Sequence, residues 1–156
     1  MDIHYGPGVS PIDSDDGTKL NHVATHVLAE HPLPGSVQLV IIDDDYMASL
    51  NRSYRGKAAT TDVLSFSFSD SEADSISFEI ADGLEKSSGE IYISLRQADL
   101  QAEELGILRV EEIARLLTHG LLHLAGYEHD SETELLHMER ETDRLLQSAG
   151  LLPVSL

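Results

Sequence analysis

The run THGLLHLAGYEHD, residues 118–130, constrains the fold of this chain more than any other segment. A helix through its first half places His119 and His123 one turn apart on the same face, because side chains four residues apart on an α-helix are neighbours. Gly126 permits a sharp turn at the end of that helix, and His129 can then return as a third imidazole. The run therefore predicts a helix that ends where three histidines converge on one metal ion.

Three protein ligands indicate an open zinc site. The fourth tetrahedral position is left for water, and zinc lowers the pKa of a bound water to about 7. A structural zinc site usually has a fourth protein ligand, often a cysteine, and this chain has no cysteine. We therefore predict that His119, His123 and His129 bind one catalytic Zn²⁺ per chain.

The histidine spacing is similar to the metzincin protease signature H-E-x-x-H-x-x-G-x-x-H, with the histidines and the later glycine at the same positions. Gly120, however, stands where the protease has the glutamate that activates water. The pattern therefore predicts metal binding and argues against proteolysis. A zinc peptidase or amidase with a base recruited from elsewhere stays an alternative.

The net charge of −18 limits how this chain can bind nucleic acid. A protein with a broad phosphate-binding surface is usually basic, so any nucleic-acid site here must be a local basic patch. The densest patch is Arg52, Arg55 and Lys57 in NRSYRGK, in a chain with only 10 lysines and arginines. From spacing alone, Arg55 is a solvated charge more often than a catalytic group.

Length and composition predict one domain over residues 1–156, since a chain of 156 residues with 41% hydrophobic residues can bury a core. No segment approaches the roughly 18 apolar residues of a membrane helix. The amino-terminal residues have an acid at position two and no apolar run. We therefore expect a cytoplasmic protein without a membrane partner.

Hydrophobic periodicity predicts an α+β fold, a small mixed sheet of about four strands covered by four or five helices, with the zinc site at the end of a central helix. Strands are predicted at residues 1–5, 37–43, 62–68 and 90–95. Helices are predicted through residues 20–28, from Asp43 or Asp44 to 54, at 97–105, at 109–125, and from Ser131 to Gly150. Residues 69–88, rich in Ser, Asp and Glu, are predicted to be a long solvated loop, with a weak strand near SFEI.

The helix predicted at 109–125 has one apolar stripe, and its two histidines lie off that stripe. The stripe consists of Val110, Ile113, Ala114, Leu117, Leu121 and Leu124. The other histidines, such as His22, His26 and His137, have no glycine-punctuated third ligand and are expected to be structural or exposed. Asn51 is read as a surface amide and Asp62 as a helix or turn cap.

Three segments in order, LNRSYRGKAATTDVLSFSF, GEIYISL and HGLLHLAGYEHD, resemble the YbeY family of bacterial ribosomal RNA maturation factors. The resemblance runs from about residue 39 to residue 146. It implies an α+β fold and a single-strand-specific, zinc-dependent endoribonuclease acting in maturation and quality control of small-subunit ribosomal RNA, at the 16S 3′ end. It also implies that His119, His123 and His129 bind the metal and that Arg55 binds the scissile phosphate. The implied partners are single-stranded ribosomal RNA precursor and the small subunit or its proteins, and not DNA.

The chain departs from the family pattern at three positions. Glu128 replaces the usual aspartate before the last histidine, and Thr60 and Ser67 stand where the family often has prolines. Phosphodiester cleavage needs negative charge to be stabilised, which zinc and one arginine can do without a glutamate at position 120.

The general base stays unassigned, with Glu128 and Glu90 as possibilities. A non-catalytic ribosome-assembly factor with a structural metal is the second alternative.

Overall fold

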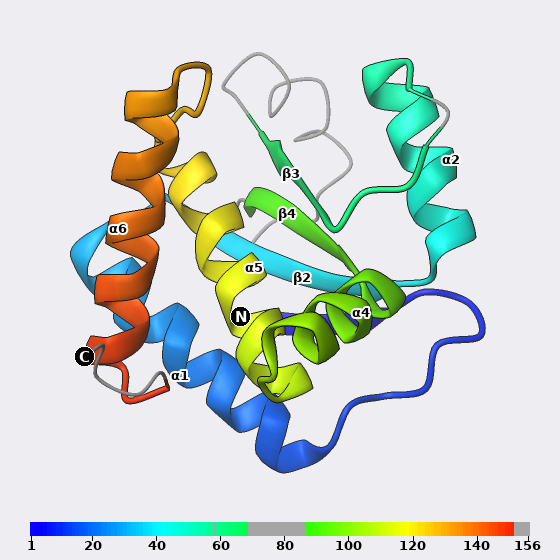
Figure 1. The fold of residues 1–156 in the computed structure, drawn as a ribbon, viewed down its shortest axis with the longest axis horizontal. Helices are drawn as coiled ribbons and strands as arrows, with labels where there is room; N and C mark the ends of the chain where they lie inside the picture. Colours follow the sequence, from blue (N-terminus) through cyan, green and yellow to red (C-terminus); the bar gives the residue numbers. More distant parts are fainter. Residues whose placement is uncertain (58, 69–86, 152–156) are drawn as a thin grey trace, which may run out of the picture.

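The computed structural model describes residues 1–57, 59–68 and 87–151. In these ranges four strands and five helices form an α+β fold, which confirms the predicted class (Figure 1). The strands are β1 (Asp2–Tyr5), β2 (Ser36–Ile42), β3 (Val63–Ser67) and β4 (Ser87–Ser94). The helices are α1 (Ser14–Glu30), α2 (Asp44–Arg55), α4 (Leu95–Leu105), α5 (Arg109–Leu124) and α6 (Glu132–Ser148).

The sheet is mixed, with the strand order β1-β2-β4-β3. β1 and β4 both run parallel to β2, and β3 lies antiparallel to β4 at the edge. Parallel neighbours need a crossover connection, and α1 supplies it between β1 and β2. Alternate residues of β2 therefore face two different layers, with Leu39 and Ile41 in the main core and Ile42 in a smaller cluster with Met47 of α2.

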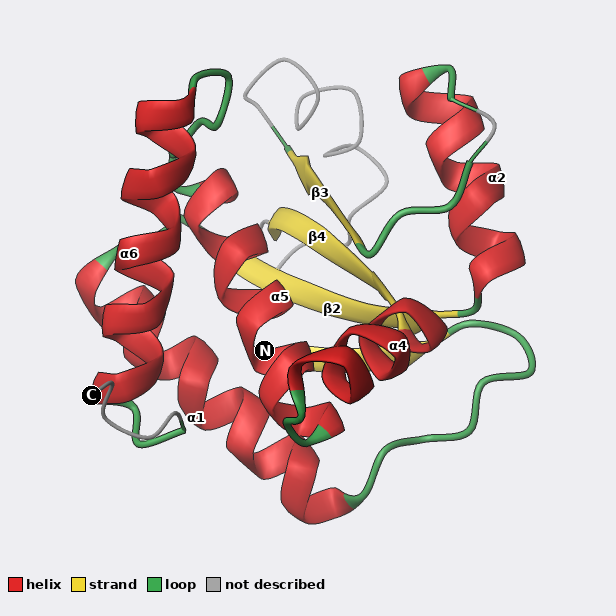
Figure 2. Ribbon diagram, in the orientation of Figure 1, coloured by secondary structure: helices red, strands yellow, loops and turns green. Residues whose placement is uncertain are grey.

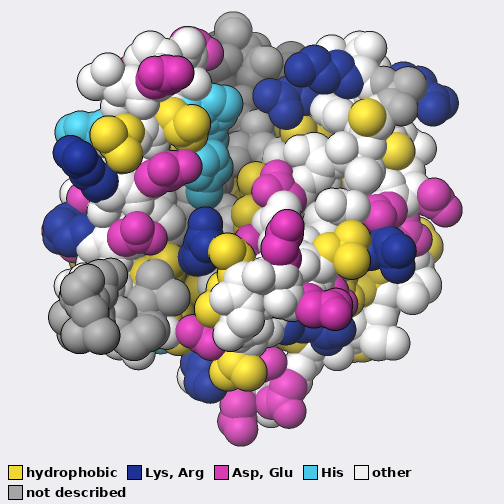
Figure 3. All heavy atoms as spheres, in the orientation of Figure 1, with side chains coloured by type: hydrophobic (Ala, Val, Ile, Leu, Met, Phe, Trp, Pro, Cys, Tyr) yellow, Lys and Arg dark blue, Asp and Glu magenta, His cyan; other side chains and the backbone are white. Residues whose placement is uncertain are grey.

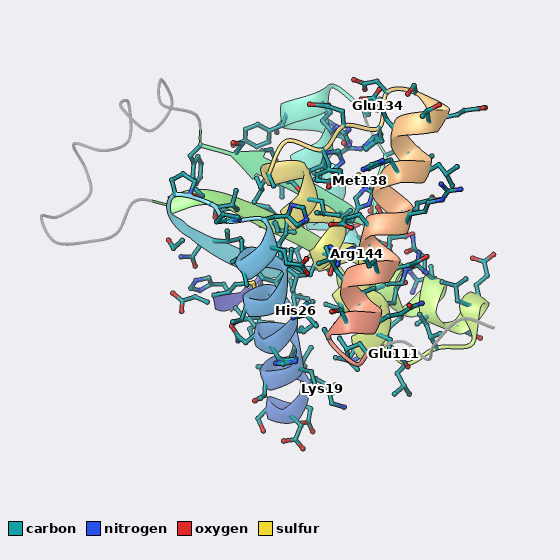
Figure 4. The ribbon with its side chains drawn as sticks, turned by 90° about the vertical axis from the view of Figure 1, so that its left-hand side faces the viewer. Lys19, His26, Glu111, Glu134, Met138 and Arg144 are labelled. Carbon is teal, nitrogen blue, oxygen red and sulfur yellow. The ribbon has the colours of Figure 1, made fainter. Side chains whose placement is uncertain are left out.

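Helix α5 is the centre of the main layer, between the sheet and the helices α1, α4 and α6 (Figure 2). The prediction of a single buried stripe was too narrow, because a helix enclosed in this way is buried on most sides. Its buried residues outside that stripe are Glu112, Leu116, Thr118, Gly120 and Leu122. In Figure 4, α6 carries Glu134, Met138 and Arg144 along its length, and Met138 is fully buried in the main core.

The predicted helix starts are confirmed where the site is built. Asp43 Oδ1 accepts a hydrogen bond of 2.8 Å from the Tyr46 amide and begins α2. Gly56, at φ 70°, ends the helix after Arg55, one residue beyond the predicted end at 54. Ser131 Oγ accepts one of 3.1 Å from the Glu134 amide at the start of α6. These local signals fix where the last turn of α2, with Arg55, lies in the chain.

The predicted loop at residues 69–88 lies outside the described residues, except for its last two positions. Residues 87 and 88 belong to β4, which begins earlier than the sequence indicated because this end of the strand pairs with β2 at Ser36. Over the described part of the chain, none of the helices is both long enough and apolar enough to cross a membrane.

Candidate metal centre

The last turn of α5 and the segment after it bring the three predicted histidines together. Gly126, at φ 107°, turns the chain directly after the helix, and its amide donates to the His123 carbonyl at 3.0 Å. The ring centroids lie 5.0 Å apart for His119 and His123, 4.6 Å for His123 and His129, and 5.9 Å for His119 and His129. One ligand nitrogen from each ring lies within 4.8 Å of the other two, so the group can hold one metal ion.

The surroundings disfavour protonation of the two helical imidazoles, His119 and His123. Burial, followed by the neighbouring His123 and His129, lowers the pKa of His119 to about 4. Burial and His129 also lower the pKa of His123. Neutral imidazoles offer the lone pairs that a metal needs, so the donor set fits Zn²⁺ and similar borderline cations.

Gly120 faces the sheet and not the histidines. A Cβ atom built there would lie 2.9 Å from Ile91 Cγ2 and 3.0 Å from Ser65 Oγ, closer than a methyl group can approach without a shift. Helix α5 can lie this close to β3 and β4 only because this residue has no side chain. The position that corresponds to the protease glutamate is therefore a packing contact, and a carboxylate there would not point at the metal ligands.

A cleft of about 440 Å³ joins the three histidines to the end of α2. Its walls are Tyr54 and Arg55, residues 61–67 around the edge strand β3, and His119, His123, Leu124 and His129, and we call it the histidine cleft. Arg55 is exposed, and its charge is close enough to contribute to the lowered pKa of His123. Figure 3 shows histidine side chains in a hollow and Lys and Arg side chains gathered over the end of α2. The fold thus places Arg55 with the predicted ligands, which are more than sixty residues away in the chain.

Asp62 is a site residue that the sequence reading treated only as a cap. Its Oδ1 accepts from the Val63 amide at 2.8 Å, which is the turn role, while Oδ2 accepts from Gln101 Nε2 at 3.1 Å. It also lines the histidine cleft, and its charge opposes the lowering of the His119 pKa. The sequence signal that could have indicated Asp62 as a site residue is its position directly before the predicted strand in the segment TTDVLSF.

Two other readings change with the structure. Asn51 is not a surface amide: it is 3% exposed, and its Nδ2 donates to the Ala59 carbonyl at 2.6 Å, which holds the segment after α2. Glu90 alternates with residues that face α5, so its side chain lies on the opposite face of the sheet, where its Oε2 accepts from the Tyr92 hydroxyl at 3.2 Å. Glu90 is thereby removed as a candidate base.

The remaining candidate, Glu128, is exposed and adjoins His129 in the chain, and its charge favours the protonated form of His123. Among the described residues, His119, His123 and His129 are the only group of three or more His, Asp or Glu side chains placed to hold one metal ion. His31 instead contacts Glu141, with Nε2 2.7 Å from Oε2, and His26 Nε2 lies 3.8 Å from Glu30 Oε2. These two fit the structural reading.

The fold and the site together define an α+β protein in which three histidines at the end of a central helix face an arginine across a cleft. The family model described as Endoribonuclease YbeY matches residues 12–150. The chain belongs to the YbeY family.

Relatives with the name Endoribonuclease YbeY cover most of the chain. The protein from Carboxydothermus hydrogenoformans is 37% identical over 139 residues, which is 87% of this chain and 90% of the relative. The protein from Pelotomaculum thermopropionicum is 43% identical over 116 residues, 74% of this chain and 72% of the relative. The solution structure of TM1509 from Thermotoga maritima shares the fold, with a TM-score of 0.57 and 21% identity over 95% of this chain and 91% of that one.

Proposed function

We propose that this protein is a zinc-dependent endoribonuclease that cleaves single-stranded RNA in the maturation and quality control of small-subunit ribosomal RNA, at the 16S 3′ end. The observation that carries the proposal is the placement of Arg55 across one cleft from three converging histidines, two of which have lowered pKa values. The family, whose printed description is an endoribonuclease, supports it. The partners would be ribosomal RNA precursor and the small subunit or its proteins, in the cytoplasm.

His119, His123 and His129 would hold the zinc ion. When bound, zinc supplies a Lewis acid for phosphate oxygens and lowers the pKa of water. Arg55 has no hydrogen bond or salt bridge to another described side chain, so its planar guanidinium is available to bind a phosphate through two parallel hydrogen bonds. This contact would stabilise the negative charge that develops on the phosphoryl oxygens.

Tyr54 explains why the substrate would be single-stranded. Its side chain is 67% exposed at the wall of the histidine cleft, and its ring meets Phe66 edge-on at 4.8 Å. An exposed ring beside a basic group is a surface on which an unpaired base can stack, whereas a paired base is already stacked in its duplex. Arg52 and Lys57 are also exposed near this end of α2, and they supply the local positive charge that a chain of net charge −18 otherwise lacks.

No observation favours the peptidase alternative. The position of the protease glutamate is Gly120, which packs on Ile91 and Ser65. A peptidase would therefore need a base on another element and a cleft shaped for a peptide. A casein digestion by the purified protein tests this alternative directly, and we expect none.

Zinc content and RNA cleavage, measured on one preparation, test the proposal. We expect about one zinc ion per chain, cleavage of an end-labelled single strand, loss of cleavage in chelator, and recovery when zinc is added back. The same strand annealed to its complement should resist cleavage. Cleavage that persists in chelator would contradict the zinc dependence, and equal cleavage of the duplex would contradict the single-strand specificity.

Ribosome co-sedimentation separates an enzyme from an assembly factor. If a His123→Ala protein still co-sediments and still supports normal ribosomal RNA ends, the non-catalytic alternative is correct. We expect instead that the substituted protein leaves unprocessed precursor ends.

A further inference from the structure

A second cavity, of about 370 Å³, lies on another side of His119. It shares Asp62, Val63 and His119 with the histidine cleft, and α4, α5 and α6 supply its other walls. We call it the Glu112 cavity, after the most buried charged group that lines it. Those other wall residues are Gln101, Glu112, Arg115, Leu116, Glu139, Thr142 and Asp143. The proposed cleavage uses none of them.

Glu112 and Arg115 form an incompletely bonded ion pair in this cavity. Glu112 is only 2% exposed, and Arg115 Nε lies 3.5 Å from its Oε1. Neither of these two atoms has a hydrogen-bond partner among the described residues. A buried charge without full hydrogen bonding is costly, and such a group in a native protein commonly has a partner outside the chain.

The pair faces the same space as the candidate metal ligand. Glu112, Arg115 and His119 are spaced by three and four residues on α5, which places them along one face of the helix. The cavity therefore presents a carboxylate acceptor, a guanidinium donor and an imidazole in a row. Burial raises the pKa of Glu112, and Arg115 opposes that effect.

The charges of the cavity exclude the simplest ligands. Asp62, Glu139 and Asp143 also line it, so its net charge is negative and a phosphate group would be repelled. In the described parts of the chain, no third ligand lies close enough to Glu112 and Asp62 to form a metal site. A neutral ligand with hydrogen-bond donors for a carboxylate and an acceptor for a guanidinium fits better.

Guanine has this arrangement on one edge. Its N1–H and exocyclic amino group are adjacent donors, and its O6 is the neighbouring acceptor. Adenine, cytosine and uracil each lack two adjacent donors on that edge, so a carboxylate beside a guanidinium distinguishes guanine from them. The volume is within the range of ordinary small-molecule sites.

We propose that the Glu112 cavity binds a guanine base of the RNA, in a nucleotide adjacent to the scissile phosphate, with Glu112 accepting from N1–H and the amino group and Arg115 donating to O6. The proposal rests on the proposed ribonuclease function. His119 lines both cavities, so a base in the Glu112 cavity would lie next to a phosphate in the histidine cleft. It makes Glu112 and Arg115 the residues that determine base preference.

Two measurements on the zinc-loaded full-length protein test this. The first is binding of GMP, IMP and AMP by calorimetry, since the three share a phosphate and differ only in the base edge. We expect GMP to bind at least tenfold more tightly than IMP, which lacks the amino group, and than AMP. The second is sequencing of the cut ends of a randomised single-stranded RNA, where we expect guanine to be enriched at one position beside the cut.

Glu112→Gln should reduce the GMP preference at least tenfold and remove the enrichment, without loss of zinc. Glu104→Gln, an exposed position on α4, is the matched control and should leave both unchanged. If Glu112→Gln does not fold, Glu112→Gln with Arg115→Met removes both charges together and should show the same loss.

The outcomes separate the two proposals. Cleavage without base enrichment, together with equal binding of the three nucleotides, would overturn the guanine site and leave the ribonuclease intact. A GMP preference that Glu112→Gln abolishes, in a protein that never cuts RNA, would support the guanine site and overturn the ribonuclease.

Discussion

The protein places histidines in two contrasting environments, one at the end of α5 and one between α1 and α6. At the end of α5, His119 and His123 are half-buried beside His129, and burial and mutual repulsion lower their pKa values. At the other place, His31 Nε2 lies 2.7 Å from Glu141 Oε2, which also accepts a 2.8 Å hydrogen bond from Arg144. The first environment disfavours protonation of His119 and His123. In the second, the imidazole of His31 contacts a carboxylate that is also hydrogen-bonded to Arg144.

This difference shows that the partner of a histidine, more than its presence, separates a metal ligand from a structural residue. Arg144 and His31 lower the pKa of Glu141 to about 2, after allowance for the opposing effect of burial, and Arg144 also contacts Glu30 at 3.0 Å. These bonds link α6 to α1. Within the described ranges, neither His119 nor His123 is paired with a carboxylate in this way, so their lone pairs remain available.

Removal of one predicted metal ligand should have the largest effect. We expect His119→Ala or His123→Ala to lose the zinc and to reduce RNA cleavage by more than about 100-fold. Substitution of a residue that only hydrogen-bonds to a metal ligand already reduces metal affinity or activity by about 10 to 100-fold. His31→Ala, the control, should keep both. Elemental analysis and single-turnover cleavage measure these effects. Undiminished zinc in both α5 variants would refute the site.

Arg55→Ala should keep the zinc and the fold and reduce cleavage by about 10² to 10³-fold, the usual effect of losing one donor to a developing charge. Arg55→Lys should recover only part of the activity, because an ammonium lacks the planar fork. Arg140→Ala is the matched control, since Arg140 is an exposed arginine of α6 that lines neither cavity. A wild-type rate for Arg55→Ala would contradict the phosphate role, and loss of zinc or of folding would make Arg55 structural.

Gly120→Ala should destabilise the protein by about 1 to 3 kcal/mol, because the added methyl group meets Ile91 and Ser65. Gly120→Glu should be worse and should not create a peptidase. Gly17→Ala, in α1, is the control: a Cβ there has only Ile3 Cδ1 at 4.0 Å, so we expect it to stabilise the helix by about 0.5 to 1 kcal/mol. Urea unfolding measures both. Unchanged stability of Gly120→Ala would show that α5 does not need this close approach.

Glu141→Gln should cost about 1 kcal/mol at neutral pH, as expected for partly exposed charged hydrogen bonds. The folded pKa of Glu141, about 2, lies below its ordinary 4.5. Its contribution is therefore present above pH 4.5 and is lost as the pH falls from there toward 2. The difference in unfolding free energy between wild type and variant should shrink over that window. A constant difference would contradict the role of the charge.

Zinc affinity should change by less than about tenfold between pH 7 and pH 6, the smallest of these effects. His119, with a pKa of about 4, and His123, with a lowered pKa, carry few protons for zinc to displace in that range. Competition with a chromophoric chelator at several pH values measures this. A steeper loss would mean that the imidazoles are protonated in the folded protein.

Much of this molecule follows from local sequence. The α+β class, the start of α2 at Asp43 and the turn after α5 at Gly126 were all predictable, because periodicity, caps and glycine conformations depend on residues near one another in the chain. The histidine triplet belongs to the same group, since its spacing of four and six residues is itself a local geometry.

Other features needed the tertiary structure, because they depend on which distant segments meet. Spacing could not show that Asn51 is buried against the Ala59 carbonyl, or that the face of β4 with Glu90 turns away from the histidines. From spacing alone, Gly120 was interpreted as the position of a missing general base. The structure shows that the packing of α5 on Ile91 requires a glycine there.

The sequence by itself determined the candidate ligands, the helix that carries them and the family. The packing of the sheet and helices decided that Arg55 and Asp62 lie beside those ligands, and that Glu112 and Arg115 face a cavity next to them. The reason is physical: a helix sets the distance between residues one turn apart, but only the burial of apolar faces against each other brings α2, β3 and α5 to one cleft.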